Sequence, residues 1–343
     1  MIAFKQVCAC AGLAAAVALS PLGAGDAVAQ GALKNVTYVQ PNPSAINSFQ
    51  IYVAIGEGYF KEEGLNVTVQ SVDGSAPVLQ ALAAGQAQIG RPGPAPVLNA
   101  RARGVDVVFI YNALPKSSFG IVVKRDDPYK QVTDLKGKTI GTGTRDGAEV
   151  GFARAILNDA GMQQDKDYTF IPVGDGGPAT AGFLRGDIQA YVAATSDAAI
   201  LNARGMPVRD ITPGKFQSYF GNGYAAMRDY IDKNPDVIEG FGRAMVRATR
   251  FIMEPKNRDK ALAHLAAGNP QEGEDKKFAT ALLEAVLAKA TPPDTSKGWG
   301  YQNPQDWENW HKALLATGDL KQALPSLDAA YTNKFIEAWN KTK

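Results

Sequence analysis

The stretch Ala81-Leu-Ala-Ala-Gly85-Gln-Ala-Gln-Ile89 has a counterpart later in the chain, Gly182-Phe-Leu-Arg-Gly186-Asp-Ile-Gln-Ala190. Each copy reads as the end of a helix, a glycine suited to a left-handed C-cap, and a strand that begins three or four residues later. Strands alternate with helices around both copies, which is typical of parallel β–α–β units. The sequence therefore predicts an α/β protein with two similar halves.

The alternation can be followed through both halves. In the first, we predict strands at 36–39, 67–70 and 105–111 and helices at 47–60, 78–84 and 96–103. In the second, we predict strands at 138–141, 168–173 and 188–193 and helices at 149–160, 179–185 and 198–204. From Asp229 onward strands nearly vanish, and helices are predicted at 235–253, 258–267, 271–290, 306–316 and 328–339. These late helices must bury apolar faces, and we expect them to pack on the first half.

The amino terminus reads as a secretory signal. Lys5 precedes an apolar run from Val7 to Leu22, and Ala27-Val-Ala29 is a small-residue cleavage site, so we expect cleavage after Ala29 and a periplasmic mature protein. The apolar run is shorter than the ~20 residues that span a membrane. Both cysteines of the chain lie in the signal, so the mature protein has no thiolate nucleophile, cysteine zinc site or iron–sulfur cluster.

Charge and the remaining motifs exclude several function classes. The chain has 36 Lys+Arg and 34 Asp+Glu, a net charge of +2 that leaves no electrostatic footprint for nucleic acid. The loop Gly141-Thr-Gly-Thr-Arg-Asp-Gly147 is one residue too long for a dinucleotide fingerprint, and no G-x-x-x-x-G-K-[ST] loop occurs. His264 and His311, the two histidines, fit neither metal spacing nor a catalytic triad. We expect no cofactor, metal or catalytic residue.

Further motifs carry a resemblance to a known family. Ile55-Gly-Glu-Gly-Tyr-Phe-Lys-Glu-Glu-Gly-Leu65 is followed by Gln80-Ala-Leu-Ala-Ala-Gly85, then by Asp134-Leu-Lys-Gly-Lys138, the unit at 187–194 and Tyr331-Thr-Asn-Lys-Phe335. In this order the chain resembles the periplasmic substrate-binding proteins of ABC importers of the nitrate, sulfonate and taurine group, which includes binders of the thiamine pyrimidine precursor. The resemblance spans nearly the whole mature chain and gives 331–335 as part of a C-terminal helix.

The resemblance implies the two-lobed type II fold of periplasmic binding proteins, with two crossings and a ligand cleft. We expect the signal peptide at 1–29, the first part of lobe 1 at 30–120, lobe 2 at 121–218, and the return crossing with the C-terminal helices of lobe 1 at 219–343. The candidate crossings are 119–124 and 219–227.

Candidate ligand-binding residues follow the predicted strands, because ligands of open α/β sheets lie beyond the carboxyl ends of strands and helix N-termini there favour anions. In the first half they are Asn42, Ser44, Asn47, Ser48, Phe49, Ser75, Arg91 and Gly93. In the second half and the return crossing they are Thr144, Arg145, Thr195, Asp197, Asn222 and Tyr224. Plain helix capping explains the Ser and Asn residues as well, and surface ion pairing the arginines.

Two ligand classes stay open. Arg91 and Arg145 favour a small organic anion of the sulfonate, taurine, nitrate or carboxylate type, because a guanidinium grips such groups bidentately. The alternative is a neutral heteroaromatic ring, such as a pyrimidine, held by Phe49, Tyr52 or Tyr224. The family has bulky side chains where this chain has Ala194-Thr-Ser-Asp197, so the site has room for a larger guest.

The predicted function is that of a solute-binding component, not an enzyme. We expect a monomer that binds a small molecule and delivers it to a membrane permease with its cytoplasmic ATPase. A thiamine-pyrimidine synthase shares the fold, but the resemblance implies that it needs a cysteine cluster and an active-site histidine. A sensor subunit that presents its ligand to a membrane receptor is the third class.

Overall fold

The computed structural model describes residues 32–175 and 177–341. The residues from Leu33 onward form one compact unit. The predicted signal peptide and its cleavage after Ala29 lie outside the described residues. Within the described part, no helix has both the length and the apolar character needed to cross a bilayer.

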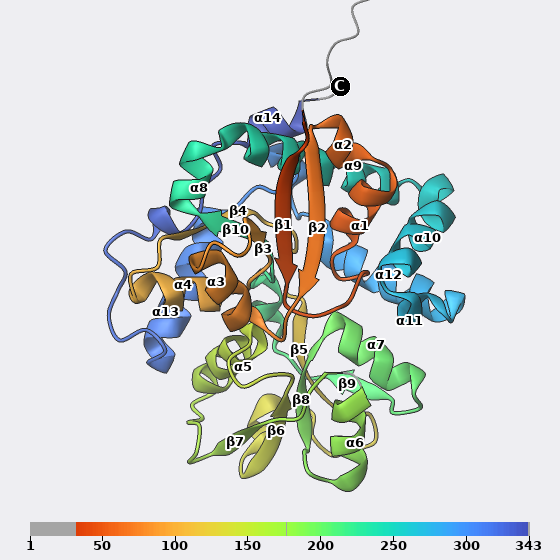
Figure 1. Ribbon diagram of the computed structural model, residues 1–343. Helices are drawn as coiled ribbons and strands as arrows, with labels where there is room; N and C mark the ends of the chain where they lie inside the picture. Colours follow the sequence, from red (N-terminus) through yellow and green to blue (C-terminus); the bar gives the residue numbers. More distant parts are fainter. Residues whose placement is uncertain (1–31, 176, 342–343) are drawn as a thin grey trace, which may run out of the picture. The chain divides into compact units, whose positions relative to one another are not determined.

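The first sheet has five strands in the order β2-β1-β3-β10-β4 (Figure 1). Its strands are β1 (Lys34–Gln40), β2 (Leu65–Ser71), β3 (Ile89–Gly90), β4 (Val107–Tyr111) and β10 (Tyr224–Met227). β1 pairs in parallel with β2 and β3, whereas β10 runs antiparallel to β3 and β4. Its helices are α1 (Phe49–Gly56), α2 (Tyr59–Glu62), α3 (Ser75–Ala83) and α4 (Pro94–Ala102), and together these elements form the first lobe.

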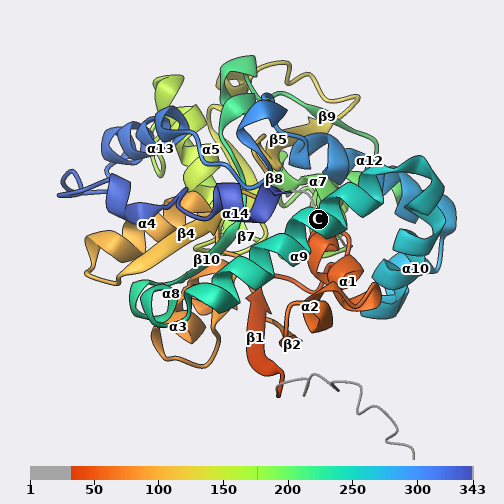
Figure 2. The same cartoon turned by 90° about the horizontal axis from the view of Figure 1, so that it is seen from above.

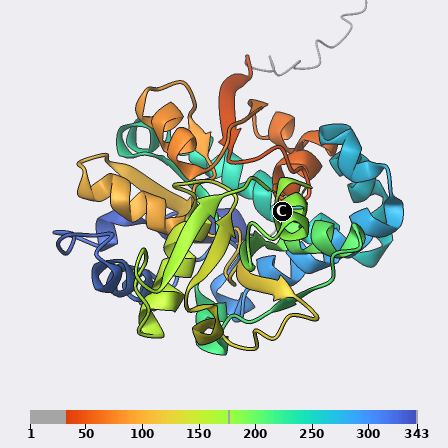
Figure 3. The same cartoon turned by 90° about the horizontal axis from the view of Figure 1, so that it is seen from below.

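The second sheet repeats this plan with the order β7-β6-β8-β5-β9 (Figure 1). Figure 3 views the molecule from the side of this sheet. Its strands are β5 (Phe119–Lys124), β6 (Lys138–Thr142), β7 (Tyr168–Pro172), β8 (Ala190–Ala194) and β9 (Val208–Asp210). β6 pairs in parallel with β7 and β8, and β5 runs antiparallel to β8 and β9. With η1 (Val132–Leu135), α5 (Ala148–Asp159), α6 (Gly177–Arg185), α7 (Thr195–Ala203) and η2 (Gly214–Ser218), it forms the second lobe.

The two matching stretches of sequence occupy equivalent places. Gly85 follows α3 with a φ of 70°, and Gly186 follows α6 with a φ of 78°. Both glycines therefore adopt the left-handed conformation that ends a helix at little steric cost. The strands that come next, β3 and β8, are the third in order of their sheets. The prediction of two similar α/β halves is confirmed.

The crossings between the lobes differ from the prediction. Residues 119–124, expected as the first crossing, form β5 of the second sheet, so Phe119 and Gly120 do not belong to the first lobe. Residues 224–227 of the expected return crossing form β10 of the first sheet. The chain passes between the sheets at 112–118 and 211–223. β5 and β10 are each the first strand after a crossing. The apolar residues that we predicted as crossings therefore belong to these strands.

The C-terminal part is helical: α8 (Arg228–Lys233), α9 (Pro235–Met253), η3 (Pro255–Asn257), α10 (Arg258–Gly268), α11 (Pro270–Gly273), α12 (Lys276–Ala290), η4 (Thr295–Lys297), α13 (Pro304–Thr317), η5 (Asp328–Ala330) and α14 (Ile336–Asn340). The long helix α9 packs against α1, α2 and α14 of the first lobe (Figure 2). However, α12 also packs on α7, and α13 packs on both α4 and α5. The expectation that these helices cover the first lobe alone was therefore incomplete.

Three helix predictions differ from the structure, each for a local reason. The helix expected at 47–60 is divided because Gly58 has a φ of 78°. The helix expected at 271–290 begins anew at Lys276, where the Asp275 side chain caps the Phe278 amide. Residues 331–335 are not helical, because Tyr331 bridges to Phe109 of β4 and Thr332 donates its amide to the Phe109 carbonyl. The expected helix at 328–339 is thus reduced to η5 and α14.

Candidate ligand-binding site

A cavity of about 560 Å³ lies between the two lobes. First-lobe loops after β1, β2 and β3 form one wall, and the loops after β6, β7 and β8 form the other. Residues of α11 and α12 close one side. Both parallel sheets therefore direct the carboxyl ends of their strands at the same space, which is where open α/β sheets bind ligands.

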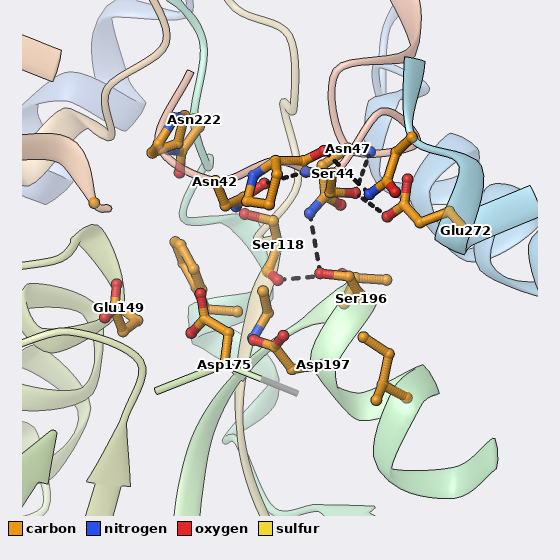
Figure 4. A pocket seen from close by; sticks show the side chains of 18 of the residues that line it. Asn42, Ser44, Asn47, Ser118, Glu149, Asp175, Ser196, Asp197, Asn222 and Glu272 are labelled. Atoms are coloured by element: carbon orange, nitrogen blue, oxygen red, sulfur yellow. Dashed lines mark hydrogen bonds between the residues drawn. The ribbon is translucent and has the colours of Figure 1, made fainter. Parts of the chain in front are cut away.

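The loop after β1 is held in place by the C-terminal part. Ser44 donates its hydroxyl to Glu272 Oε1 at 2.5 Å, and the Ile46 amide donates to Glu272 Oε2 at 3.1 Å. Ser44 also accepts the Asn47 amide, and its own amide donates to the Asn42 side chain. Both carboxyl oxygens of Glu272 are thus engaged in shaping the cavity wall (Figure 4).

One hydrogen bond joins the two walls at the side of the cavity. Asn47 Nδ2 of the first lobe donates to Ser196 Oγ, in the first turn of α7, at 3.0 Å. Figure 4 shows this contact, with Asn42 and Ser44 above it and Asp197 below. The lobes also approach closely elsewhere: a Cβ added at Gly74 would lie 3.2 Å from Thr144 Oγ1. The two lobes are therefore in direct contact at these points.

Two aspartates of the second lobe share one tyrosine hydroxyl. Tyr191 Oη lies 3.2 Å from Asp175 Oδ1 and 3.4 Å from Asp197 Oδ2. Asp197 is buried, and burial together with the nearby Asp175 carboxylate raises its pKa to about 8. Asp175 remains accessible from the cavity, yet reduced hydration raises its pKa as well. At neutral pH this pair holds a proton and can both donate and accept hydrogen bonds.

Helix ends explain why acids gather here. Asp197 lies in the first turn of α7 and accepts the Ala194 amide at 3.0 Å. Glu149 lies in the first turn of α5 and accepts the Thr144 amide and hydroxyl, while burial raises its pKa. Carboxyl groups are favoured at both places by the helix dipole. Among the described residues, no donor reaches Asp175 Oδ2 or Asp197 Oδ1, so these oxygens are available to a ligand.

Arg91 provides the opposite chemistry on the first-lobe wall. Its side chain follows β3, is 3% exposed, and lies near the buried hydroxyls of Tyr38 and Tyr224. Within residues 32–175 and 177–341, no acceptor reaches its Nε or Nη2 atom. Unpaired donors of a buried guanidinium are costly, so Nε and Nη2 are available to an acceptor of a ligand in the cavity.

The charge balance of the cavity is acidic. Five carboxyl side chains line it, those of Glu149, Asp175, Asp197, Glu272 and Asp275, against the guanidinium groups of Arg91 and Arg204. Apolar side chains, among them Leu114, Phe119, Val192, Ile200 and Phe278, line the remainder. Such a cavity can hold an apolar body while polar groups fix its edges. In the described part, no cluster of His, Cys, Asp or Glu has metal-binding geometry.

Most of the candidate residues lie on the cavity wall. These are Asn42, Ser44, Asn47, Ser75, Arg91, Thr144, Thr195, Asp197 and Asn222. Their roles in binding stay predictions. Asn222 donates to the Arg91 carbonyl at 3.1 Å and Thr195 to the Ser118 carbonyl at 3.1 Å, so both also stabilise the crossings.

Five candidates lie elsewhere. Phe49 and Tyr224 are fully buried in the first-lobe core, where Tyr224 donates to Gln50. Ser48 is buried against the Tyr38 hydroxyl, and Gly93 uses its amide to bind Ser75 Oγ. Arg145 lines a second cavity and not the first. The expectation that Phe49, Tyr52 or Tyr224 holds an aromatic ligand is therefore wrong, since Tyr52 also bonds to Gln40 outside the cavity. Arg91 and Arg145 line different cavities, so they do not bind one anion together.

Sequence reasoning missed several cavity residues, chiefly Ser118, Glu149, Asp175, Ser196 and Glu272. Ser196 lies between the candidates Thr195 and Asp197, and Glu149 lies in the first turn of α5, so the first turn of a helix was the signal that both carried. Asp175 follows β7, and the sequence prediction included no candidate after this strand. Glu272 gave no signal, because it reaches the cavity from a helix far along the chain.

The relatives of this chain include both a binding protein and a synthase. The riboflavin-binding protein RibY of Chloroflexus aurantiacus is 26% identical over 324 residues, covering 93% of this chain and 91% of that protein. A 4-amino-5-hydroxymethyl-2-methylpyrimidine phosphate synthase of Aspergillus parasiticus is 27% identical over 222 residues, covering 59% of this chain and 62% of the synthase. Both binding proteins and enzymes therefore occur among its relatives.

Solved structures support the fold. The periplasmic aliphatic sulphonate-binding protein SsuA of Escherichia coli superposes with a TM-score of 0.66 at 18% identity, covering 87% of this chain and 91% of SsuA. The fold is thus that of a two-lobed periplasmic binding protein, as the sequence resemblance implied. The family described as NMT1/THI5 like matches residues 45–258. This chain is a member of the NMT1/THI5-like family.

Proposed function

We propose that the protein is the extracytoplasmic solute-binding component of an ABC importer and that it captures a neutral, polar heteroaromatic molecule between its lobes. The observation that carries this proposal is the acidic cavity of about 560 Å³ in which Arg91 is the buried cation. Cavities of ~300–1,000 Å³ suit guests larger than a small inorganic anion. Delivery to a permease with its ATPase follows from the relationship to periplasmic binding proteins.

The polar groups fit a ring with both donors and acceptors on its edge. Arg91 offers donors to a carbonyl or ring nitrogen. The Asp175–Asp197 pair accepts from ring N–H or amino groups and, when protonated, also donates. Apolar side chains such as Phe119 and Phe278 can cover the ring faces. RibY, whose name gives riboflavin as its ligand, supports this ligand class.

The small organic anion is the second candidate, and Arg91 is the observation that favours it. An anion would neutralise the buried guanidinium and accept hydrogen bonds from Nε and Nη2. It would also meet Glu149 and the one negative charge that the Asp175–Asp197 pair keeps at neutral pH, and like charge there opposes its binding. For this reason we rank the neutral ring first.

The positions of the two histidines favour binding over catalysis, because both histidines lie outside the cavity. His264 Nε2 lies 2.6 Å from Glu57 Oε1, and His311 Nε2 accepts the Leu324 amide. Neither side chain lines the cavity. We therefore propose a binder rather than a synthase, and consumption of a bound pyrimidine or flavin by the purified protein would contradict this.

Native mass spectrometry of the exported protein, purified without denaturation, tests the ligand class. We expect a non-covalent adduct whose extracted molecule absorbs in the near ultraviolet. Arg91→Gln should purify without the adduct, whereas Arg125→Gln, which changes an exposed arginine outside the cavity, should retain it. An adduct that proves to be a sulfonate, nitrate or simple carboxylate would replace this proposal with the second candidate.

A further inference from the structure

A second hollow, which we call the arginine groove, lies between α3 and α4 of the first lobe and α5 of the second. It encloses about 620 Å³. Small residues leave this space open, among them Ala76, Ala95 and Gly151. At its base a Cβ added to Gly151 would lie 3.0 Å from Ala95 Cβ, so α4 and α5 touch there.

Three arginines reach the groove from different elements. Arg103 follows α4, Arg145 precedes α5, and Arg154 lies within α5. Arg154 forms an ion pair with Asp319 and donates Nε to Gln164 at 3.1 Å. Arg103 and Arg145 have no side-chain partner among the described residues.

The groove is rich in donors and poor in opposing charge. Two carboxylates line the groove, Asp319, which pairs with Arg154, and Asp146. Within the part of the chain that the structure describes, Asp146 makes no ion pair with Arg103 or Arg145. The amide side chains of Gln80 and Asn99 also line the groove. The first turn of α5, which begins at Ala148, adds the positive end of a helix dipole. Together these groups attract a compact anion.

Position links the arginine groove to the proposed ligand cavity. Thr144 and Ser75 line the ligand cavity, and the residues that follow them, Arg145 and Ala76, line the arginine groove. Since Arg103 comes from the first lobe and Arg145 from the second, a guest held by both would span the lobes. Such a guest stabilises the lobe arrangement in which both arginines face the same space.

We propose that the arginine groove binds a compact oxyanion of the phosphate type through the exposed side chains of Arg103 and Arg145. The phosphate group belongs to a free solute or to a phospholipid headgroup, and both sources offer the same oxygens to the guanidinium groups. The site is separate from the proposed ligand cavity, so its absence would leave the proposed function untouched.

Calorimetric titration of the exported protein with inorganic phosphate tests this inference, at an ionic strength kept constant with sodium chloride. We expect saturable binding, weakened at least about tenfold by Arg103→Gln/Arg145→Gln, because each charged hydrogen-bonding group contributes about that factor. Arg125→Gln should bind as the unaltered protein does. Because neither groove arginine has a side-chain partner, the double variant should melt at the same temperature without phosphate.

A second arm separates the two sources of phosphate. Sedimentation with anionic phosphatidylglycerol vesicles, compared with zwitterionic phosphatidylcholine vesicles of zero net charge, shows whether an anionic headgroup is bound. Vesicle binding that the double variant loses, without binding of free phosphate, supports the site with lipid as its source. No binding in either arm, equal binding in the double variant, or equal affinity for chloride would each overturn the proposal.

Discussion

Asn47 and Ser196, which belong to opposite lobes, are joined by a hydrogen bond of 3.0 Å from Nδ2 to Oγ. Asn47 is itself fixed by its amide, which donates to Ser44 Oγ, and Ser44 is fixed by Glu272 of α11. The contact between the lobes therefore rests on a chain of hydrogen bonds that begins in the C-terminal helices. This arrangement couples closure of the cavity to residues far away in the sequence.

Loss of this contact should favour an open arrangement. We predict that Asn47→Ala increases the radius of gyration of the ligand-free protein in small-angle X-ray scattering. A single hydrogen bond contributes about 0.5–1.5 kcal/mol, enough to shift a two-state balance roughly two- to tenfold. Asn66→Ala, at an exposed asparagine of β2, is the matched control. Equal radii for all three proteins would show that the contact does not hold the lobes together.

The buried Asp197 should make stability depend on pH. The folded protein keeps this proton up to about pH 8, whereas an unfolded chain releases it near pH 4. Between these values the folded state binds more protons, so its free energy of unfolding falls as the pH rises. Asp197→Asn should remove at least about 1 kcal/mol of this fall between pH 5 and pH 8.

Urea unfolding at several pH values measures this effect. Asn can still accept the Ala194 amide that Asp197 now accepts, so the cap of α7 should survive the change. Asp126→Asn, at an exposed position, should leave the pH dependence as it is. If Asp197→Asn and the unaltered protein lose stability in parallel from pH 5 to pH 8, Asp197 does not hold a proton in the folded state.

The buried Arg91 side chain should lower the free energy of unfolding when no ligand is bound. We predict that Arg91→Met raises the free energy of unfolding of ligand-free protein by about 1–3 kcal/mol, because it removes a buried charge whose Nε and Nη2 atoms have no partner among the described residues. Protein refolded from denaturant, and thus freed of bound molecules, is the material for the measurement. Arg125→Met is the control. A less stable Arg91→Met variant would mean that the guanidinium already has a partner in the folded chain.

The C-terminal helix α14 should be sensitive to one glycine of α9. A Cβ added at Gly242 would lie 2.1 Å from Trp339 Nε1, and this indole donates to the Ile238 carbonyl. Gly242→Ala should therefore lower the free energy of unfolding by about 1–3 kcal/mol through overpacking. Gly214→Ala, where a Cβ meets nothing within 4 Å, is the matched control. Equal urea midpoints for the two variants would show that α14 moves aside easily.

The sequence predicts the fold well where local pattern and tertiary structure agree. The repeated helix–glycine–strand unit predicted two halves, since the left-handed conformation that ends each helix favours glycine at positions 85 and 186. β5 and β10 could not be assigned in this way. A strand that pairs in the sheet of the next lobe has the same apolar pattern as one that stays in the sheet of its own lobe. The sequence of a strand does not show which strands it pairs with.

The cavity was predictable in part for the same reason. Strand ends and helix starts mark Ser75, Arg91 and Thr195, so these positions could be found from alternation alone. Arg145 was misplaced because adjacent residues of one loop, Thr144 and Arg145, face different hollows. Glu272 depends on how α11 docks near β1, which is a tertiary contact across the whole chain.

We propose that the cavity between the lobes binds an uncharged polar ring rather than a small anion. Isothermal titration of refolded, ligand-free protein with riboflavin, an aminopyrimidine, taurine and nitrate tests it most directly. We predict micromolar or tighter binding of at least one ring compound, lost in Arg91→Gln, and no measurable heat with taurine or nitrate. Tight binding of taurine or nitrate, with neither ring compound bound, would contradict the account.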